Sequence, residues 1–113
     1  MREIIKNSNF HWNEISNGSN AYSKDLITSS YWENVSFHHV LVKAGGEIEI
    51  HIHEKQDEAH FVISGKGIGI VSGQEIVIEI GDVMFVNNKI IHGVKNNTDN
   101  DLLLLCVFNP PLS

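Results

Sequence analysis

Short apolar segments with a period of two, or rich in β-branched residues, recur from about Ser36 to the end of the chain. Such alternation is typical of strands, and no window has the 3.6-residue apolar period of an amphipathic helix. The connections are short and rich in Gly, Asn and Asp, as in hairpins. The sequence therefore predicts an all-β sandwich or small barrel. The expected strands are Val35–Val42, Glu47–His53, His60–Ser64, Gly67–Ser72, Glu75–Ile80, Val83–Val86, His92–Asn96 and Leu102–Phe108.

The length and composition favour a single domain. The chain has 113 residues, of which 42% are hydrophobic and 19% are charged, as in an ordinary globular domain. No repeat, linker or low-complexity segment indicates a second unit. We expect one domain over residues 1–113, with a barrel over 35–110 and a less regular N-terminal arm over 1–34. The apolar anchors expected for this arm are Trp12, Tyr31 and Trp32.

Charge and cysteine content restrict the partners and the location. Fourteen acidic and eight basic residues give a net charge of −6, and no Lys/Arg cluster is present that could neutralise phosphates. No apolar run approaches the length of about 18 residues that marks a membrane span. The single cysteine, Cys106, lies in an apolar run, which predicts a small core side chain and no disulfide. We expect a cytoplasmic protein with neither nucleic acid nor membrane as a partner.

Two of the seven histidines have the spacing of metal ligands. His51 and His53 are two residues apart on a predicted strand, so their side chains point to one face, about 6 to 7 Å from each other. Glu58 leads into the next predicted strand and joins them if the two strands pair. By the same alternation, Glu49 faces inward near the mouth, where we expect a solvated carboxylate. The opposite face carries Ile48, Ile50 and Ile52, which we expect to pack against the arm or a second subunit.

The spacing of these residues resembles that of the cupin superfamily. Every fixed position of the first cupin motif is filled, by Gly45, His51, His53, Glu58 and Gly65. The outer positions of the second motif are filled by Gly81, His92 and Asn96. That motif usually has an internal proline and glycine where this chain has Asn87 and Lys89, and Asn can still form such a turn. The resemblance covers about Phe37 to Pro110 and is to small single-domain cupins.

The resemblance implies a double-stranded β-helix, or jelly-roll barrel, that is often a homodimer and holds one divalent metal ion. Carried over by position, the ligands would be His51, His53, Glu58 and His92. The alternative is a cupin that has lost its metal and keeps these residues as satisfied polar groups. Three imidazoles and a carboxylate suit Fe, Mn, Ni, Co, Cu or Zn almost equally. A six-coordinate ion would keep two positions open for a substrate or O₂.

His60 lies outside the motif but two residues beyond Glu58, on the same expected face. An imidazole has an ordinary pKa of about 6.5, which suits it to proton transfer near neutral pH. The sequence thus makes His60 the candidate catalytic residue, and the alternative is a cavity histidine that orients Glu58. His38 and His39 are adjacent on a strand, so only one of them can join the pocket. Lys89 is expected to be a solvated turn residue.

Cupins include oxygenases, isomerases, lyases and decarboxylases, and the fold does not choose among them. The favoured interpretation is a divalent-metal-dependent enzyme, of the dioxygenase type, that acts on a small oxygen-rich organic substrate. The alternatives are a cupin isomerase, lyase or decarboxylase, and a nonenzymatic protein that binds or senses a sugar or an organic acid. Whether the chain is an enzyme stays open at this point.

Overall fold

The computed structural model describes residues 3–113, and these residues form strands and one short 3-10 turn. The all-β prediction is confirmed. Within the described part, no helix is long and apolar enough to cross a membrane. The elements are η1 (Asn7–Asn9), β1 (Asn13–Glu14), β2 (Gly18–Ile27), β3 (Ser36–His51), β4 (Asp57–Ser64), β5 (Lys66–Val71), β6 (Gln74–Glu79), β7 (Val83–Val86), β8 (His92–Lys95) and β9 (Leu102–Asn109).

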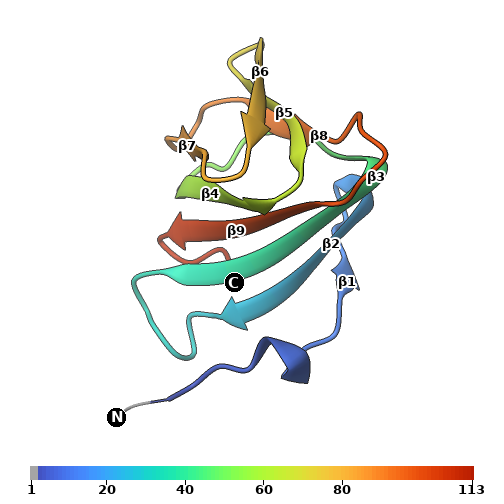
Figure 1. The fold of residues 1–113 in the computed structure, drawn as a ribbon. Coiled ribbons are helices and arrows are strands. Elements are labelled where there is room, and N and C mark those ends of the chain that lie inside the picture. Colours follow the sequence, from blue (N-terminus) through green and yellow to red (C-terminus); the bar gives the residue numbers. More distant parts are fainter. Residues whose placement is uncertain (1–2) are drawn as a thin grey trace.

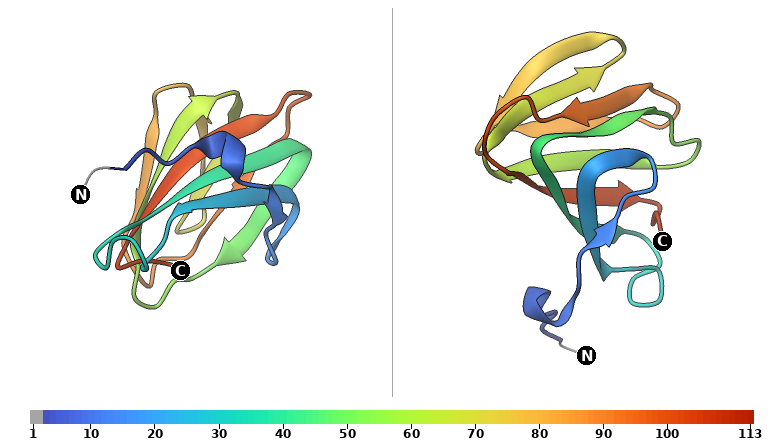
Figure 2. Two further views of the ribbon diagram at one scale, coloured as in Figure 1. Left: turned by 90° about the horizontal axis from the view of Figure 1, so that it is seen from below. Right: turned by 90° about the vertical axis from the view of Figure 1, so that its right-hand side faces the viewer.

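The strands form a nearly closed antiparallel barrel of the jelly-roll type, as expected. Hydrogen bonding follows the order β6-β5-β8-β3-β9-β4-β7, with β2 on β3 and β1 on β2. Strands β2, β3, β9 and β4 lie side by side, and the β5–β6 hairpin closes the far side of the barrel (Figure 1). The N-terminal segment runs along the outside of the barrel beyond β2 (Figure 2).

Strand β3 is one long strand where the sequence predicts two. The glycine-containing segment that separates the two predicted strands stays in the sheet, although Gly45 has a φ of 75°, because two backbone hydrogen bonds join it to Asn96. The Gly45 N–H donates to the Asn96 carbonyl, and the Asn96 N–H donates to the Gly46 carbonyl, each at 2.9 Å. The first part of β3 pairs with β9 and the last part pairs with β8. A single strand therefore joins the two sides of the barrel.

A β-bulge near the end of β3 breaks the predicted alternation. Ile48 pairs with Val94 and His51 pairs with His92, so two residues of β3 lie opposite Gly93 alone. Because of this extra residue, Ile48 faces the interior together with His51 and is only 8% exposed. The prediction that Ile48 shares the face of Ile50 and Ile52 is therefore wrong. Those two isoleucines are 51% and 48% exposed. Glu49 is exposed, as expected for a solvated carboxylate.

The predicted arm is attached to the barrel through β2, which pairs along β3. Trp12 packs on His39 with ring centroids 5.2 Å apart and lies under the Lys24 ammonium at 4.7 Å, so it is an anchor. Trp32 stacks on Phe37 but is 44% exposed. Tyr31 is 60% exposed, so its predicted role as an apolar anchor is wrong. The core lies between the two sides of the barrel and includes Val40, Val42, Val62, Val94, Leu102, Leu104 and Phe108.

Candidate metal centre

Four side chains converge in the barrel interior, and they are the four that the motif spacing predicts. Each of them offers a ligand atom, and these atoms all lie within 4.8 Å of one another. His51 ends β3, His53 follows it, Glu58 lies in β4 and His92 begins β8. The last two are buried, at 2% exposure each, and the first two are partly exposed. One cation could contact all four residues.

Backbone carbonyls fix how two of these imidazoles are oriented. Nδ1 of His51 is 2.6 Å from the carbonyl oxygen of Glu49, which lies in the bulge. Nδ1 of His92 is 2.7 Å from the carbonyl oxygen of Ile90. A carbonyl only accepts, so in both rings Nδ1 carries the proton and donates it. The unprotonated Nε2 atoms therefore face the cluster, as in metal-binding histidines.

Two of the converging atoms lack a hydrogen-bond partner. Glu58 Oε1 and His92 Nε2 are buried without a hydrogen bond, although they contact each other. The Nε2 atoms of His51 and His53 are 3.1 Å apart. Acceptors that face one another in a buried space repel unless a proton or a cation lies between them. This donor set fits a divalent metal ion.

Protonation at neutral pH also suits metal binding. Burial lowers the pKa of His51 and His53 below the usual 6.5, which keeps both rings neutral. Burial opposes ionisation of Glu58, but the hydrogen bond to His60 and the nearby His92 ring outweigh it and hold the pKa of this carboxyl well below its usual 4.5. The cluster thus offers neutral imidazoles and an ionised carboxylate.

The turn before β8 holds the two sides of the cluster together. The carboxylate of Asp57 accepts a hydrogen bond of 2.8 Å from the backbone N–H of Asn88. The N–H of Lys89 donates to the carbonyl of His53, also at 2.8 Å. Lys89 has a φ of 66°, so it is this residue, and not the asparagine beside it, that takes the left-handed conformation. Its side chain is exposed, as expected.

His60 lies beside the cluster, and its ring is held at both ends. Nε2 is 3.0 Å from Glu58 Oε2, and Nδ1 is 3.2 Å from the sulfur of Cys106. Burial opposes a charge on this ring, but Cys106 and Glu58 raise the pKa of His60 to about 10. Cys106 is buried, as predicted, but no spacing or motif in the sequence indicates this contact. It arises because β4 pairs with β9 and brings the two residues opposite each other.

The cluster opens into a cavity of about 270 Å³. Of the two adjacent histidines, His38 lines this cavity, whereas His39 packs under Trp12. His11 is exposed and lies outside the cavity. The cavity wall is completed mainly by Ile15, Ser23, Asp25, Val40, Ile48, Cys106, Phe108 and Leu112.

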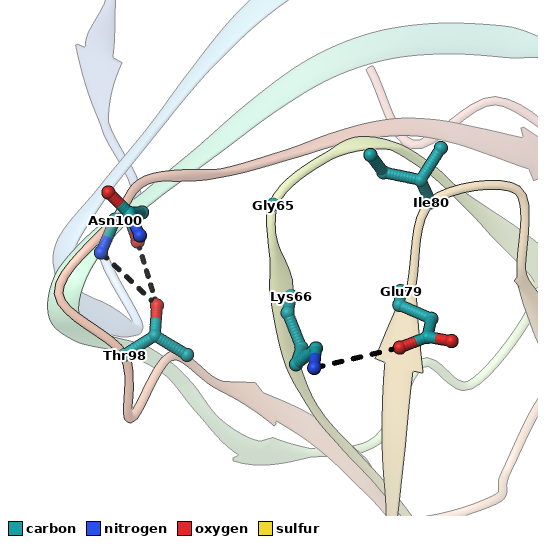
Figure 3. Close-up of a pocket in the computed structure, with 6 residues that line it drawn as sticks. All are labelled: Gly65, Lys66, Glu79, Ile80, Thr98 and Asn100. Atoms are coloured by element: carbon teal, nitrogen blue, oxygen red, sulfur yellow. Dashed lines mark hydrogen bonds and ion pairs between the residues drawn. The ribbon is translucent and has the colours of Figure 1, made fainter.

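A larger hollow of about 560 Å³ lies elsewhere on the barrel, between β5, β6 and the loop before β9 (Figure 3). Lys66 and Glu79 form an exposed ion pair there at 3.7 Å. Thr98 and Asn100 bond to each other across the loop. Its polar groups are paired among themselves and do not converge, so the histidine-lined cavity is the candidate functional site.

The Cupin_2 family, described as "Cupin domain", matches residues 38–108. The chain belongs to this family. As a sequence relative, an L-ectoine synthase of Wolinella succinogenes is 34% identical over 113 residues, which covers 98% of this chain and 76% of the relative. An oxalate-binding protein of Thermotoga maritima is 30% identical over 63 residues, covering 56% of this cupin and 52% of the relative. The fold matches the crystal structure of a predicted oxalate decarboxylase of Thermotoga maritima with a TM-score of 0.87 and 23% identity, over 96% of this chain and 99% of the other.

Proposed function

We propose that this cupin is a divalent-metal-dependent enzyme that acts on a small, oxygen-containing organic molecule, with His51, His53, Glu58 and His92 as the metal ligands. The observation that carries the proposal is the buried pair of acceptor atoms, Glu58 Oε1 and His92 Nε2, which face each other without a donor. The ligand set does not select among Fe, Mn, Ni, Co, Cu and Zn. A bound divalent ion would polarise a substrate oxygen and stabilise negative charge that develops on it.

In this proposal His60 is the residue that holds or moves a proton at the site. Its Nε2 binds the Glu58 oxygen that points away from the other imidazoles, so it also orients the carboxylate. Both ring nitrogens are engaged and the residue is 5% exposed. A proton could reach a bound molecule only if one of these contacts opened. The catalytic and the orienting roles predict different outcomes for His60→Gln, since only the catalytic role leaves metal affinity unchanged while turnover falls.

The reaction type is the least constrained part of the proposal. Relatives named L-ectoine synthase favour a synthase over the dioxygenase interpretation. Oxygen consumption by the Fe-loaded protein across a panel of enolisable substrates would restore the dioxygenase assignment. The likeness to an oxalate-binding protein supports the second candidate, a cupin that binds a small molecule without converting it. Ligand-dependent thermal stabilisation with no turnover would favour that candidate.

The test of the metal site uses protein prepared without a histidine tag. Elemental analysis of the reconstituted protein should give one divalent ion per chain. His92→Ala and Glu58→Gln should each lose it, because each removes a buried ligand atom. His11→Ala is the matched control, since His11 is exposed and lies outside the cavity, and it should keep the ion. Substoichiometric metal in the reconstituted wild-type protein would refute the proposal.

A homodimer and a cytoplasmic location complete the proposal. Large apolar side chains lie exposed on the outer face of β4 and β7, where a second copy could cover them. Phe85 is 59% exposed, Val83 58%, Phe61 43% and Ile63 41%. A monomeric mass by light scattering at micromolar concentration, unchanged by Phe85→Lys, would contradict the dimer. The single unpaired cysteine supports a reducing compartment.

A further inference from the structure

A second group of polar side chains lines the candidate cavity, and the cupin motif does not include it. Asp25 lies in β2, and Ser36 and His38 lie in β3, so the pairing of these strands brings the three together. Nδ1 of His38 is 2.7 Å from Asp25 Oδ1, and Nε2 is 2.7 Å from the Ser36 hydroxyl. Asp25 and His38 line the cavity together with His53 and Glu58.

The hydrogen bonds of this group hold the His38 ring and Asp25 in one orientation. The backbone N–H of Leu112 donates to the Ser36 oxygen at 2.9 Å. The Ser36 hydroxyl can then donate to Nε2 of His38, and Nδ1–H of His38 donates to Asp25. Both ring nitrogens of His38 thus have a partner, and the Asp25 carboxylate is held against the ring through Oδ1. Among residues 3–113 no hydrogen bond reaches Asp25 Oδ2, and the side chain is 46% exposed.

The charges around the cavity restrict what this carboxylate can bind. No lysine or arginine is among the described residues that line the cavity. The side-chain carboxylates that line it are those of Glu58 and Asp25. His60 and a metal ion would both offset Glu58, which leaves Asp25 as the negative charge at the other end of the cavity. A second carboxylate on a ligand would therefore meet a negative wall, whereas a protonated amine would find a ready acceptor.

Phe108 lies between the two polar ends. Its ring is 5.2 Å from that of His38 and 5.4 Å from that of His53, centroid to centroid, in edge-on contact with both. The cavity wall between the His/Glu cluster and the Asp25 group is thus apolar, and the single ring of Phe108 separates the two. A ligand of a few carbon atoms could present an oxygen to the His/Glu cluster and its other end to Asp25.

We propose that Asp25, held in place by His38 and Ser36, binds a protonated amine at the end of the substrate remote from the His/Glu cluster. The substrate class is a small molecule with an oxygen donor at one end and an ammonium group at the other, rather than a dicarboxylate. This inference rests on the proposed function for the oxygen end, whereas the amine end rests on Asp25 alone.

The test uses four compounds that share one propionate skeleton and differ in the group on the third carbon. These are β-alanine, 3-hydroxypropionate, butyrate and succinate, and each is titrated calorimetrically into the wild-type protein with and without reconstituted metal. We expect β-alanine to bind about tenfold tighter than succinate. Asp25→Asn should weaken β-alanine about three- to tenfold and leave butyrate unchanged. Asp99→Asn, at an exposed loop aspartate outside the cavity, is the control and should change neither.

The inference is overturned if succinate binds as tightly as β-alanine, if Asp25→Asn leaves β-alanine unaffected, or if none of the four compounds binds. Failure of the proposed metal site is read separately. If the reconstituted protein holds no metal and still prefers β-alanine over succinate, and if Asp25→Asn loses that preference, the metal site is refuted and the amine site is supported. Circular dichroism melting of each variant confirms that the barrel is folded.

Discussion

Gly93 is the residue through which the bulge in β3 and the geometry of the cluster can be tested together. A Cβ at Gly93 would lie 2.9 Å from the carbonyl oxygen of Ile48 and 3.2 Å from the backbone nitrogen of Ile50. Both neighbours are backbone atoms of the bulge, so they cannot rotate away. Gly93→Ala must push β3 and β8 apart at the point where His51 and His92 pair.

Overpacking of this kind costs about 1–3 kcal/mol of the free energy of unfolding. For a domain of this length, 1 kcal/mol corresponds to about 4 °C in Tm, so we expect Tm to fall by about 4–12 °C. Metal ligands tolerate a displacement of about 0.5 Å, so metal affinity should fall about 10- to 100-fold. Thermal melting of the metal-free protein and competition against a chelator measure the two effects.

Gly67→Ala is the matched control for stability. Its Cβ would lie 2.8 Å from the Lys95 carbonyl and 2.7 Å from Leu102 Cδ2, on β5 and outside the cavity. It should lower Tm by a similar amount and leave metal affinity intact. If Gly93→Ala lost stability but bound metal as tightly as Gly67→Ala, the bulge would not be what positions His51 and His92.

Three further predictions follow from buried contacts. Cys106→Val removes the partner of His60 Nδ1 and should destabilise the protein by about 1–3 kcal/mol in urea unfolding, whereas Cys106→Ser, which keeps a donor, should lose less. Asn96→Ala should lower the free energy of unfolding by about 2–3 kcal/mol and leave metal binding intact, because the Asn96 amide donates to the Val42 and Asn100 carbonyls and accepts from Thr98. Unaltered urea unfolding would contradict this. The metal-free protein should lose stability as pH falls below 6.5, since His39, His51 and His53 bind protons less readily in the folded state than in the unfolded state. His60 contributes in the opposite sense, but its stabilising effect is already fully present below pH 6.5, and the stabilising effect of Glu58 declines only below pH 4.5. A free energy of unfolding that stays flat between pH 4.5 and 6.5 in urea titrations would refute this assignment.

The sequence was sufficient for the parts of this protein that depend on short-range spacing. His51, His53 and Glu58 lie within one hairpin-sized segment, and strand geometry together with the cupin spacing brings them together with His92. Turn residues and alternation also located most of the strands. These features are local or follow a known motif, so a single sequence carries them.

Features that depend on register between distant strands could not be predicted. Asp25 meets His38 only because β2 pairs with β3, and His60 meets Cys106 only because β4 pairs with β9. The bulge that turns Ile48 inward leaves no mark in the alternation itself, since one extra residue is visible only against the partner strand. Gly93, which lies opposite the bulge, is the one residue in the sequence that hints at it.

The sharing of β3 between β9 and β8 has a kinetic consequence. Its first part pairs with the last strand of the chain and its last part pairs with β8, so β3 takes its final place in the barrel only once both distant strands have joined it. Contacts between such distant segments form slowly. The histidines should therefore be brought together late, after the transition state for folding. Metal binding would then slow unfolding and leave the refolding rate almost unchanged. The ion would stabilise the folded barrel and not the transition state through which it forms.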